Sequence, residues 1–316
     1  MLDIAFDNLT SPAVLAFAIG LAAATWGTSL RLPAPVGSLL STYLLIAIGF
    51  KGGIALAKTP IADLWRPALA TIALGTITPL IAFWILRRMG RFGVQDAAAI
   101  AAHYGSVSVV TFTAASAAAI TAGLNPESFL PALVVLLEVP GIAIALVLAQ
   151  SDAAGDLRAA CREAFAGKSV VLLGGGLLIG AVATPAAVTS VDPLFGGLFP
   201  GLLALFLLDL GAMTGERLGD VRKSGPFLIG FAIAIPIGFG ALGLAAGAAA
   251  GMSTGGTAVL AVMAASASYI AAPAAVSIAL PGANPALGLS AALGVTFPFN
   301  LVIGIPVFVT LSQVIG

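Results

Sequence analysis

The stretch His103-Tyr104-Gly105-Ser106-Val107-Ser108-Val109-Val110-Thr111 lies in the middle of a long apolar segment. Alanine-rich runs that favour a helix stand on both sides of it, at residues 97–102 and 112–119. Its glycine, its two serines and its β-branched residues all lower helix propensity. We therefore expect this segment to form two half-helices with a break between them.

A similar interruption occurs about 160 residues later. Residues 264–273, Ala-Ala-Ser-Ala-Ser-Tyr-Ile-Ala-Ala-Pro, divide another apolar segment, and Pro273 lacks a backbone N–H. Paired interruptions at matching places in two halves of a membrane protein point to the binding site of a transporter. The sequence therefore predicts a secondary transporter whose site lies where the two breaks meet.

The composition is that of a membrane protein. Hydrophobic residues make up 60% and charged residues 8% of the 316 positions, whereas a soluble domain has roughly 25% charged residues. The formal net charge is zero, so no nucleic-acid partner is indicated. Asp3 and Asp7, rather than basic residues, precede the first apolar segment, so we expect it to be kept rather than cleaved as a signal peptide. The single cysteine excludes an intrachain disulfide.

Ten apolar segments are long enough to cross a bilayer, which takes about 20 residues each. We therefore predict an all-α polytopic membrane protein surrounded by lipid. The longest connection, residues 151–167, is charged, and we expect a short helix there that links the two halves on the cytoplasmic side. The ten predicted spans are 11–30, 36–57, 67–87, 95–121, 128–150, 168–185, 196–214, 225–250, 256–280 and 287–314.

The two halves of the sequence share landmarks in the same order. With five spans each, the halves have opposite orientations in the membrane. We therefore predict a five-plus-five inverted repeat, with residues 1–150 as the first repeat, residues 168–316 as the second, and two broken helices that cross. The matched landmarks are Gly49 with Gly211, Pro79 with Pro236, Asn125-Pro126 with Asn284-Pro285, and Leu137-Glu138-Val139-Pro140 with Val295-Thr296-Phe297-Pro298.

The lysines and arginines predict the orientation, because cytoplasmic loops carry the excess of positive charge. If the N-terminus lies outside, the cytoplasmic loops hold ten of the 13 basic residues, from Arg31 to Lys223. The opposite side holds only Lys58 and Arg66, and Lys51 lies within a span. Both termini are therefore expected on the non-cytoplasmic side.

Basic side chains are absent where the substrate is expected to bind. No Lys or Arg occurs between Arg91 and Arg158, and no charged residue follows Lys223. The second half-helix of each pair exposes free N–H groups and about half a positive charge at its N-terminus. Two such ends suit one monovalent anion, held with the help of hydroxyl groups. The predicted anion-binding residues are Gly105, Ser106, Ser108, Thr111, Ser268, Tyr269, Ala271 and Ala272.

The first half-helices end in free carbonyl groups, which suit a hard cation such as Na⁺. Glu138 is the one carboxylate in its apolar span, and an intramembrane carboxylate is a functional candidate. It could coordinate Na⁺, carry a proton, or sit protonated in a hydrogen bond to a neighbouring helix. The predicted coupling-ion residues are Glu138, Ser266, Thr296 and Asn300, with Glu138 as the candidate metal ligand.

Three further polar residues receive structural interpretations. We expect Lys51 and Asp209 to pair with each other or to reach a membrane interface. His103, the one histidine, is interpreted as a hydrogen-bonding residue between helices rather than a proton relay.

At these residues the chain resembles the sodium-dependent bicarbonate permease family (SbtA-like), as a divergent member. The resemblance covers all ten spans and is strongest at residues 104–111, at residues 264–285 and in the last span. It implies a gate domain of spans one, two, six and seven and a core domain of spans three to five and eight to ten. It also implies a homotrimer in the bacterial inner membrane and Na⁺-coupled uptake of bicarbonate, bound at the half-helix N-termini.

The chain departs from the family pattern at both breaks. Val109 and Val110 stand where the cyanobacterial pattern has Gly and Ser, and Tyr269, Ala271 and Ala272 replace its Asp, Ser and Gly. The short central loop argues against a PII-like regulatory partner. A less polar site leaves open a small organic monocarboxylate as the substrate, coupled to Na⁺ or to protons. A membrane anion sensor that does not transport is the alternative from another class, and no metal-ligand or catalytic spacing indicates an enzyme.

Overall fold

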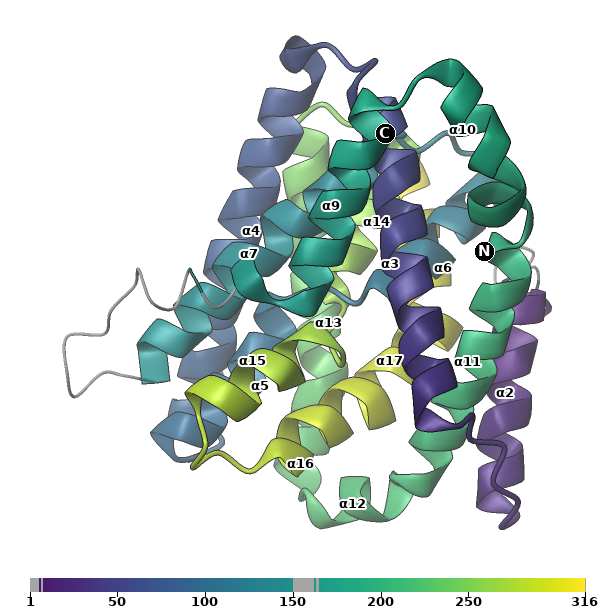
Figure 1. Cartoon of the computed structure of the whole chain (residues 1–316). Helices are drawn as coiled ribbons and strands as arrows, with labels where there is room; N and C mark the ends of the chain where they lie inside the picture. The colour runs from purple at the N-terminus through teal and green to yellow at the C-terminus, as the bar shows by residue number, and fades with distance from the viewer. Residues whose placement is uncertain (1–5, 7, 150–161, 163–164, 316) are drawn as a thin grey trace.

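The computed structural model describes residues 6, 8–149, 162 and 165–315, and these residues contain helices and no strand. The helix expected between residues 151 and 167 lies largely outside this range. Figure 1 shows a bundle of tilted helices, with shorter helical pieces crossing its middle. In chain order the helices of the first half are α2 (Pro12–Thr25), α3 (Ala34–Leu56), α4 (Ile61–Arg88), α5 (Val94–Gly105), α6 (Val109–Thr121) and α7 (Leu130–Ala149).

The second half contains more and shorter pieces. Three of its elements, η1 (Pro193–Gly197), η2 (Ser290–Thr296) and η3 (Asn300–Gly304), are wider π-helical turns within longer helices. The α-helices of this half are α9 (Lys168–Val182), α10 (Pro185–Asp192), α11 (Phe199–Glu216), α12 (Leu218–Lys223), α13 (Pro226–Ala249), α14 (Thr254–Ala265), α15 (Ala271–Ala279), α16 (Pro285–Leu289), α17 (Phe297–Phe299) and α18 (Ile305–Ile315).

Seven helical segments in the described residues are long and apolar enough to cross a membrane. They correspond to seven of the ten predicted spans, and α2, α9 and α14 are shorter apolar helices. Each of the three stops at a local signal. Gly27, in the left-handed region at φ +85°, follows α2; Pro185 follows α9; and the second break follows α14.

The predicted seventh span, residues 196–214, begins too late. The helical path starts at Pro185, where Thr184 accepts a hydrogen bond from the backbone N–H of Ala187 (3.4 Å) and Pro185 occupies the first helical turn. A threonine cap followed by proline is a standard helix start. The continuous segment therefore runs over Pro185–Glu216, through α10, η1 and α11.

The α3 and α9 helices pack closely because glycines, which have no side chain, lie at their contact. A methyl group added at Gly176 would approach the carbonyl oxygen of Ile46 to 2.6 Å and the nitrogen of Phe50 to 3.0 Å. One added at Gly49 would collide with the carbonyl oxygen of Leu173. The two backbones therefore touch, which is the means by which small residues drive helix association in a membrane.

The pair α2 and α11 is built in the same way. A methyl group at Gly20 would collide with the carbonyl oxygen of Leu208, and one at Gly211 with the carbonyl oxygen of Phe17. In the view of Figure 1, α2 and α11 lie side by side at the right, and α3 and α9 lie nearer the middle.

The two interrupted helices lie at the centre of the other bundle. All 18 positions of the most apolar window in Val94–Thr121 are buried, and every residue of α14 from Gly255 to Ala265 is buried. They pack against each other and against α4, α7, α13 and α18. Both breaks are therefore shielded from lipid by protein, as irregular backbone at membrane depth must be.

Candidate functional site

The first break is three residues long. The α5 helix ends at Gly105, residues 106–108 are extended, and α6 begins at Val109. The Ser108 hydroxyl caps α6, because it accepts hydrogen bonds from the N–H of Thr111 (3.1 Å) and from the Thr111 hydroxyl (2.8 Å). The break predicted from glycine, serine and β-branched residues is present.

The second break is two residues longer. The α14 helix ends at Ala265, and α15 begins only at Ala271, after Tyr269 and Ile270. The Ser268 hydroxyl accepts hydrogen bonds from the N–H groups of Ala271 (3.2 Å) and Ala272 (3.3 Å). A serine therefore satisfies the first free amides of the second half-helix at each break.

Three hydrogen bonds join one break to the other. The N–H of Ser108 donates to the Ser266 hydroxyl (2.9 Å), and the N–H of Ser268 donates to the carbonyl oxygen of His103 (2.8 Å). The Nδ1 of His103 lies 2.6 Å from the carbonyl oxygen of Ser268. Because a carbonyl oxygen can only accept, His103 donates this hydrogen bond. His103 is thus a hydrogen-bonding residue between helices, as interpreted from the sequence.

A small closed cavity of about 10 Å³ lies where the second half-helices begin. This volume is on the scale that admits one water molecule. Tyr269 forms part of its wall and is held edge-on against Phe297, with the ring centres 5.2 Å apart. The lining residues come from both breaks, from α7 and from α9: Val107, Ser108, Val109, Glu138, Ser169, Ser268, Tyr269, Ile270 and Ala271.

The cavity wall offers hydrogen-bond donors. The Ser108 and Ser268 hydroxyls each accept two hydrogen bonds from their own helices, so each keeps its own proton to donate. The Ser268 proton has no acceptor among the described residues, and the Ser108 hydroxyl interacts with the Tyr269 hydroxyl. The N–H groups of Val109 and Val110, in the first turn of α6, also lack an acceptor there. Donors without acceptors at two helix N-termini form an environment that favours negative charge.

Glu138 projects from the middle of α7 into this same cavity. The residue is fully buried, and neither carboxylate oxygen has a hydrogen-bond partner in the described part of the chain. The sequence analysis left three roles open for Glu138: a ligand of Na⁺, a carrier of a proton, or a protonated group bonded to a neighbouring helix. In the structure this residue lines the cavity beside the N-terminal ends of the second half-helices, where the anion was expected.

Asn300 lies at the C-terminal end of α14. Its Nδ2 donates to the carbonyl oxygen of Ala265 (2.9 Å), the last residue of that helix. Its Oδ1 is buried and unpartnered among the described residues. Asn300 is therefore positioned at one of the carbonyl ends that the sequence analysis associated with a cation.

Thr296 serves the packing of three helices. Its hydroxyl donates to the carbonyl oxygen of Ala232 (2.7 Å) and accepts from the Tyr104 hydroxyl, also at 2.7 Å. Ala232 lies four residues before Pro236, which has no N–H to bond that carbonyl. Thr296 thus supplies a hydrogen bond that the proline removes, and it does not line the cavity.

The other predicted residues divide between the cavity and its supports. Four of the predicted anion-binding residues, Ser108, Ser268, Tyr269 and Ala271, line the cavity together with Glu138. The supports are Thr111, Ala272 and Ser266, which hold the two caps and the link between breaks. Gly105 packs against Gly141 of α7, and the buried Ser106 hydroxyl has no partner among the described residues.

Ser169 on α9 was missed by the sequence analysis. It is buried and contributes the one α9 side chain to the cavity wall. It follows Lys168 at the start of an apolar span, and no local pattern distinguishes it from a serine that packs between helices. The described residues contain no group of three or more His, Cys, Asp or Glu that could hold a metal ion.

Asp209 and Lys51 do not pair with each other. Asp209 forms an ion pair with Arg31 (2.9 Å) and accepts a hydrogen bond from the N–H of Leu32. These two contacts hold the α2–α3 connection against α11. The ammonium group of Lys51 lies 4.6 Å from the ring centre of Phe199. Of the two expected arrangements, direct pairing is therefore wrong.

Comparison with known families places these observations in context. The sequence matches the Na⁺-dependent bicarbonate transporter superfamily over residues 12–313. No match is found among curated protein sequences. The family is one of transporters rather than enzymes, and its substrate is a small anion. With its apolar helices, the protein is an integral membrane protein, and the chain belongs to the Na⁺-dependent bicarbonate transporter superfamily.

Proposed function

We propose that this protein imports a small monovalent anion together with Na⁺, with bicarbonate as the best single candidate. The observation that carries the proposal is the donor-lined cavity between the two second half-helices. The hydroxyls of Ser108 and Ser268, which already accept hydrogen bonds from their own helices, and the free amide of Val109 line a space that contains no basic side chain. Hydrogen bonds to a charged group contribute about 1.5–3 kcal/mol each, so three of them can replace part of the hydration of a single anion.

The proposed binding step requires an opening. A cavity of about 10 Å³ admits water but not bicarbonate. Seven of the nine lining residues belong to the two linked breaks and the first residues of α6 and α15, and Ser169 of α9 completes the wall. We propose that α9 moves away from the breaks together with α3, because the two helices are packed together through their glycines.

The proposed movement follows a division into two domains. Spans one, two, six and seven would form the gate, built from the glycine-lined pairs α2–α11 and α3–α9, and the other six spans the core. The glycine contacts support an inverted repeat of five plus five spans, because they repeat with constant shifts. Gly176 touches Ile46 as Gly20 touches Leu208, and these positions differ by 156 and 162. The reverse contacts carry the same shifts: Gly49 with Leu173, and Gly211 with Phe17.

The proposed coupling site for Na⁺ lies at the carbonyl end of α14. The unpartnered Oδ1 of Asn300 and the carbonyl oxygen of Ala265 are oxygen ligands of the kind that Na⁺ prefers. A cation at that end and an anion at the start of α15 would each lower the cost of desolvating the other.

Glu138 favours a second candidate, coupling to a proton. Its carboxyl group shares the cavity with the proposed anion site, so two negative charges would meet there if it were ionised. Anion binding would therefore require that Glu138 accept a proton or a neighbouring Na⁺. Both versions therefore require that the charge of Glu138 be neutralised while the anion is bound.

The test is uptake of radiolabelled bicarbonate into proteoliposomes under an imposed Na⁺ gradient, and separately under an imposed pH gradient. We expect Na⁺-driven uptake that falls at least tenfold in Glu138→Gln, while Asp220→Asn, an exposed carboxylate on α12, leaves it unchanged. Uptake driven by the pH gradient alone would favour the proton version. Absence of uptake under either gradient would refute the transport proposal for bicarbonate.

The proposed orientation places both termini on the non-cytoplasmic side of a bacterial inner membrane. A Cys161→Ser background with Lys58→Cys or Thr28→Cys tests it with a membrane-impermeant maleimide on intact cells. We expect labelling of Lys58→Cys only. A homotrimer is proposed from the family resemblance, and light scattering of the purified protein in detergent measures the number of copies.

A further inference from the structure

Two adjoining hollows open at the start of α4, away from the breaks. The first, of about 600 Å³, lies among the α3–α4 connection, residues 127–129 before α7, and residues 250–252 after α13. The second, of about 510 Å³, runs along the outer sides of α4 and α13. Both include Trp65, Arg66 and Ala250 in their walls, so they form one continuous depression.

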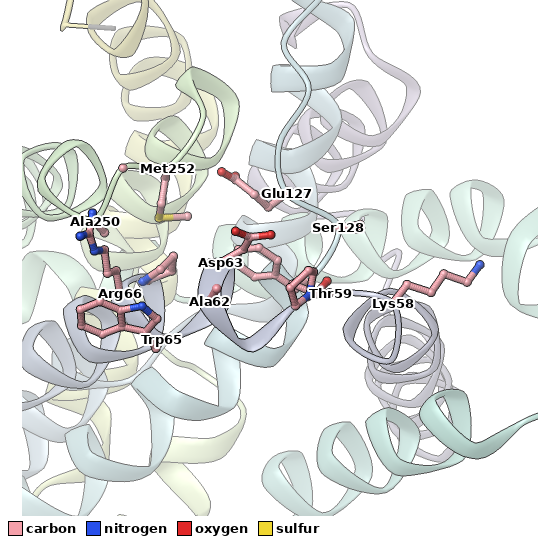
Figure 2. Close-up of a pocket in the computed structure, with 14 residues that line it drawn as sticks. Lys58, Thr59, Ala62, Asp63, Trp65, Arg66, Glu127, Ser128, Ala250 and Met252 are labelled. Atoms are coloured by element: carbon pink, nitrogen blue, oxygen red, sulfur yellow. The ribbon is translucent and has the colours of Figure 1, made fainter.

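The first hollow contains charges of both signs. Figure 2 shows the carboxylates of Asp63 and Glu127 turned toward the same space, with Arg66 at one side next to Ala250 and Lys58 directed away. Asp63 and Arg66 form no ion pair with any described residue. Glu127 is fixed in place by Ser253, whose N–H and hydroxyl donate to it at 2.5 and 3.0 Å. The hollow therefore offers one guanidinium and two carboxylates to a ligand.

The second hollow is apolar. Leu69 and Ile77 of α4 and Leu242 of α13 line it with exposed fractions of 58%, 45% and 39%. Between the two hollows stands Trp65, whose ring carries the guanidinium group of Arg66 at 5.2 Å from the ring centre. Tryptophan and arginine at the end of a membrane helix are typical of the level where lipid headgroups meet acyl chains.

We infer that this depression binds one phospholipid with a primary ammonium in its headgroup. Arg66 binds the phosphate, Asp63 and Glu127 bind the ammonium, and one acyl chain lies along the groove between α4 and α13. The charges match such a zwitterion, since a phosphate alone would be repelled by the two carboxylates. A choline headgroup fits less well, because its quaternary ammonium has no N–H to donate to them.

Native mass spectrometry of the purified protein tests this inference, with phosphatidylethanolamine, phosphatidylglycerol and phosphatidylcholine added in turn. We expect phosphatidylethanolamine to be retained at least fivefold better than either of the others. Arg66→Gln should reduce the retention of all three lipids, whereas Asp63→Asn should reduce only the preference for phosphatidylethanolamine. Arg88→Gln, at an exposed basic residue at the opposite end of α4, is the matched control and should change neither.

Three outcomes would overturn the inference: equal retention of the three lipids, preference for phosphatidylglycerol, or unchanged preference in Asp63→Asn. If Arg66→Gln or Leu69→Arg changes the number of copies in the assembly without changing lipid retention, the depression is a contact between copies of this chain instead. Thermal melting of each variant in detergent separates loss of a lipid from loss of the fold. The inference does not depend on transport, because the lipid is measured without a substrate or gradient.

Discussion

The two halves of this protein agree closely at the glycine-lined helix pairs and differ at the two breaks. In the pairs α2–α11 and α3–α9, equivalent glycines touch equivalent backbone atoms. At the breaks, Ser106 and Ser266 hold matching places before Ser108 and Ser268, yet their hydroxyls have different tasks. Ser266 bonds both Met263 and the other break, whereas Ser106 bonds no described residue. The glycine packing is therefore alike in the two halves, whereas the hydrogen bonding at the breaks differs.

The difference between the breaks extends to their amides. In the second break the first amides of α15 are taken by Ser268, whereas in the first break Val109 and Val110 keep theirs free. The first break therefore keeps more free amides, and the second has its amides bonded by the Ser268 cap. Four comparisons of variants test the likeness of the helix pairs and the difference between the breaks.

The largest effect on stability is expected at the glycine contacts. Gly176→Ala and Gly20→Ala each force a methyl group onto a carbonyl oxygen of the facing helix. Overpacking of this kind costs about 1–3 kcal/mol, so we expect the melting temperature in detergent to fall by about 5 °C or more. Gly175→Ala is the control, because nothing lies within 4 Å of its added methyl group. A clear difference between Gly176→Ala and Gly20→Ala would break the equivalence of the two pairs.

His103→Phe is expected to separate the two breaks. It leaves the buried carbonyl oxygen of Ser268 without the imidazole donor, at a cost of about 1–3 kcal/mol. His103→Gln keeps a donor and should recover part of the loss in thermal melting. If the two variants melt alike, the histidine contributes volume rather than a hydrogen bond.

The serine pair gives the sharpest comparison between the breaks. Ser266→Ala leaves the buried N–H of Ser108 without an acceptor, and we expect a loss of about 1–2 kcal/mol in the free energy of unfolding. Ser106→Ala removes no hydrogen bond to a described residue and should change stability by less than about 0.5 kcal/mol. Denaturant unfolding of both variants measures the contrast, and equal losses would show that the asymmetry has no energetic meaning.

Among the variants that lose a hydrogen bond, the smallest effect is expected for Tyr104→Phe. The substitution removes a hydroxyl that donates to Thr296, but Thr296 still donates to the carbonyl oxygen of Ala232. One lost hydrogen bond of this kind costs about 0.5–1.5 kcal/mol. Thr296→Val, which also frees the Ala232 carbonyl, should cost more when the two variants are unfolded side by side.

Local residue preferences were sufficient to predict the two breaks and most of the apolar helices. Glycine, serine and β-branched residues weaken a helix whatever it packs against, so the break within residues 103–111 could be predicted without tertiary information. The same reasoning missed the start at Pro185, although Thr184-Pro185 is a recognisable cap. Helix boundaries in apolar sequence depend on such short signals rather than on hydropathy.

The assembly of the site depends on contacts between distant residues, which local patterns do not determine. Ser169 reaches the cavity only because α9 packs against the breaks. Thr296 looked like an ion ligand in its own span, but its partner is a carbonyl 64 positions away that Pro236 has left unbonded. A pairing of Asp209 with Lys51 was one of two expectations, whereas the α2–α3 connection places Arg31 beside Asp209. In each case the way two elements pack together decides the role of the residue.

The three hydrogen bonds between the breaks have a mechanical consequence. Because Ser108, His103 and Ser268 lock the two interrupted helices together, neither can slide past the other without stranding buried polar atoms. Among the described residues, the Ser169 side chain forms no hydrogen bond across the contact between α9 and the breaks, so a movement of α9 would break no hydrogen bond of this side chain. Access from the two sides of the membrane would then alternate by displacement of one intact block. The pair of breaks would keep its shape throughout the transport cycle.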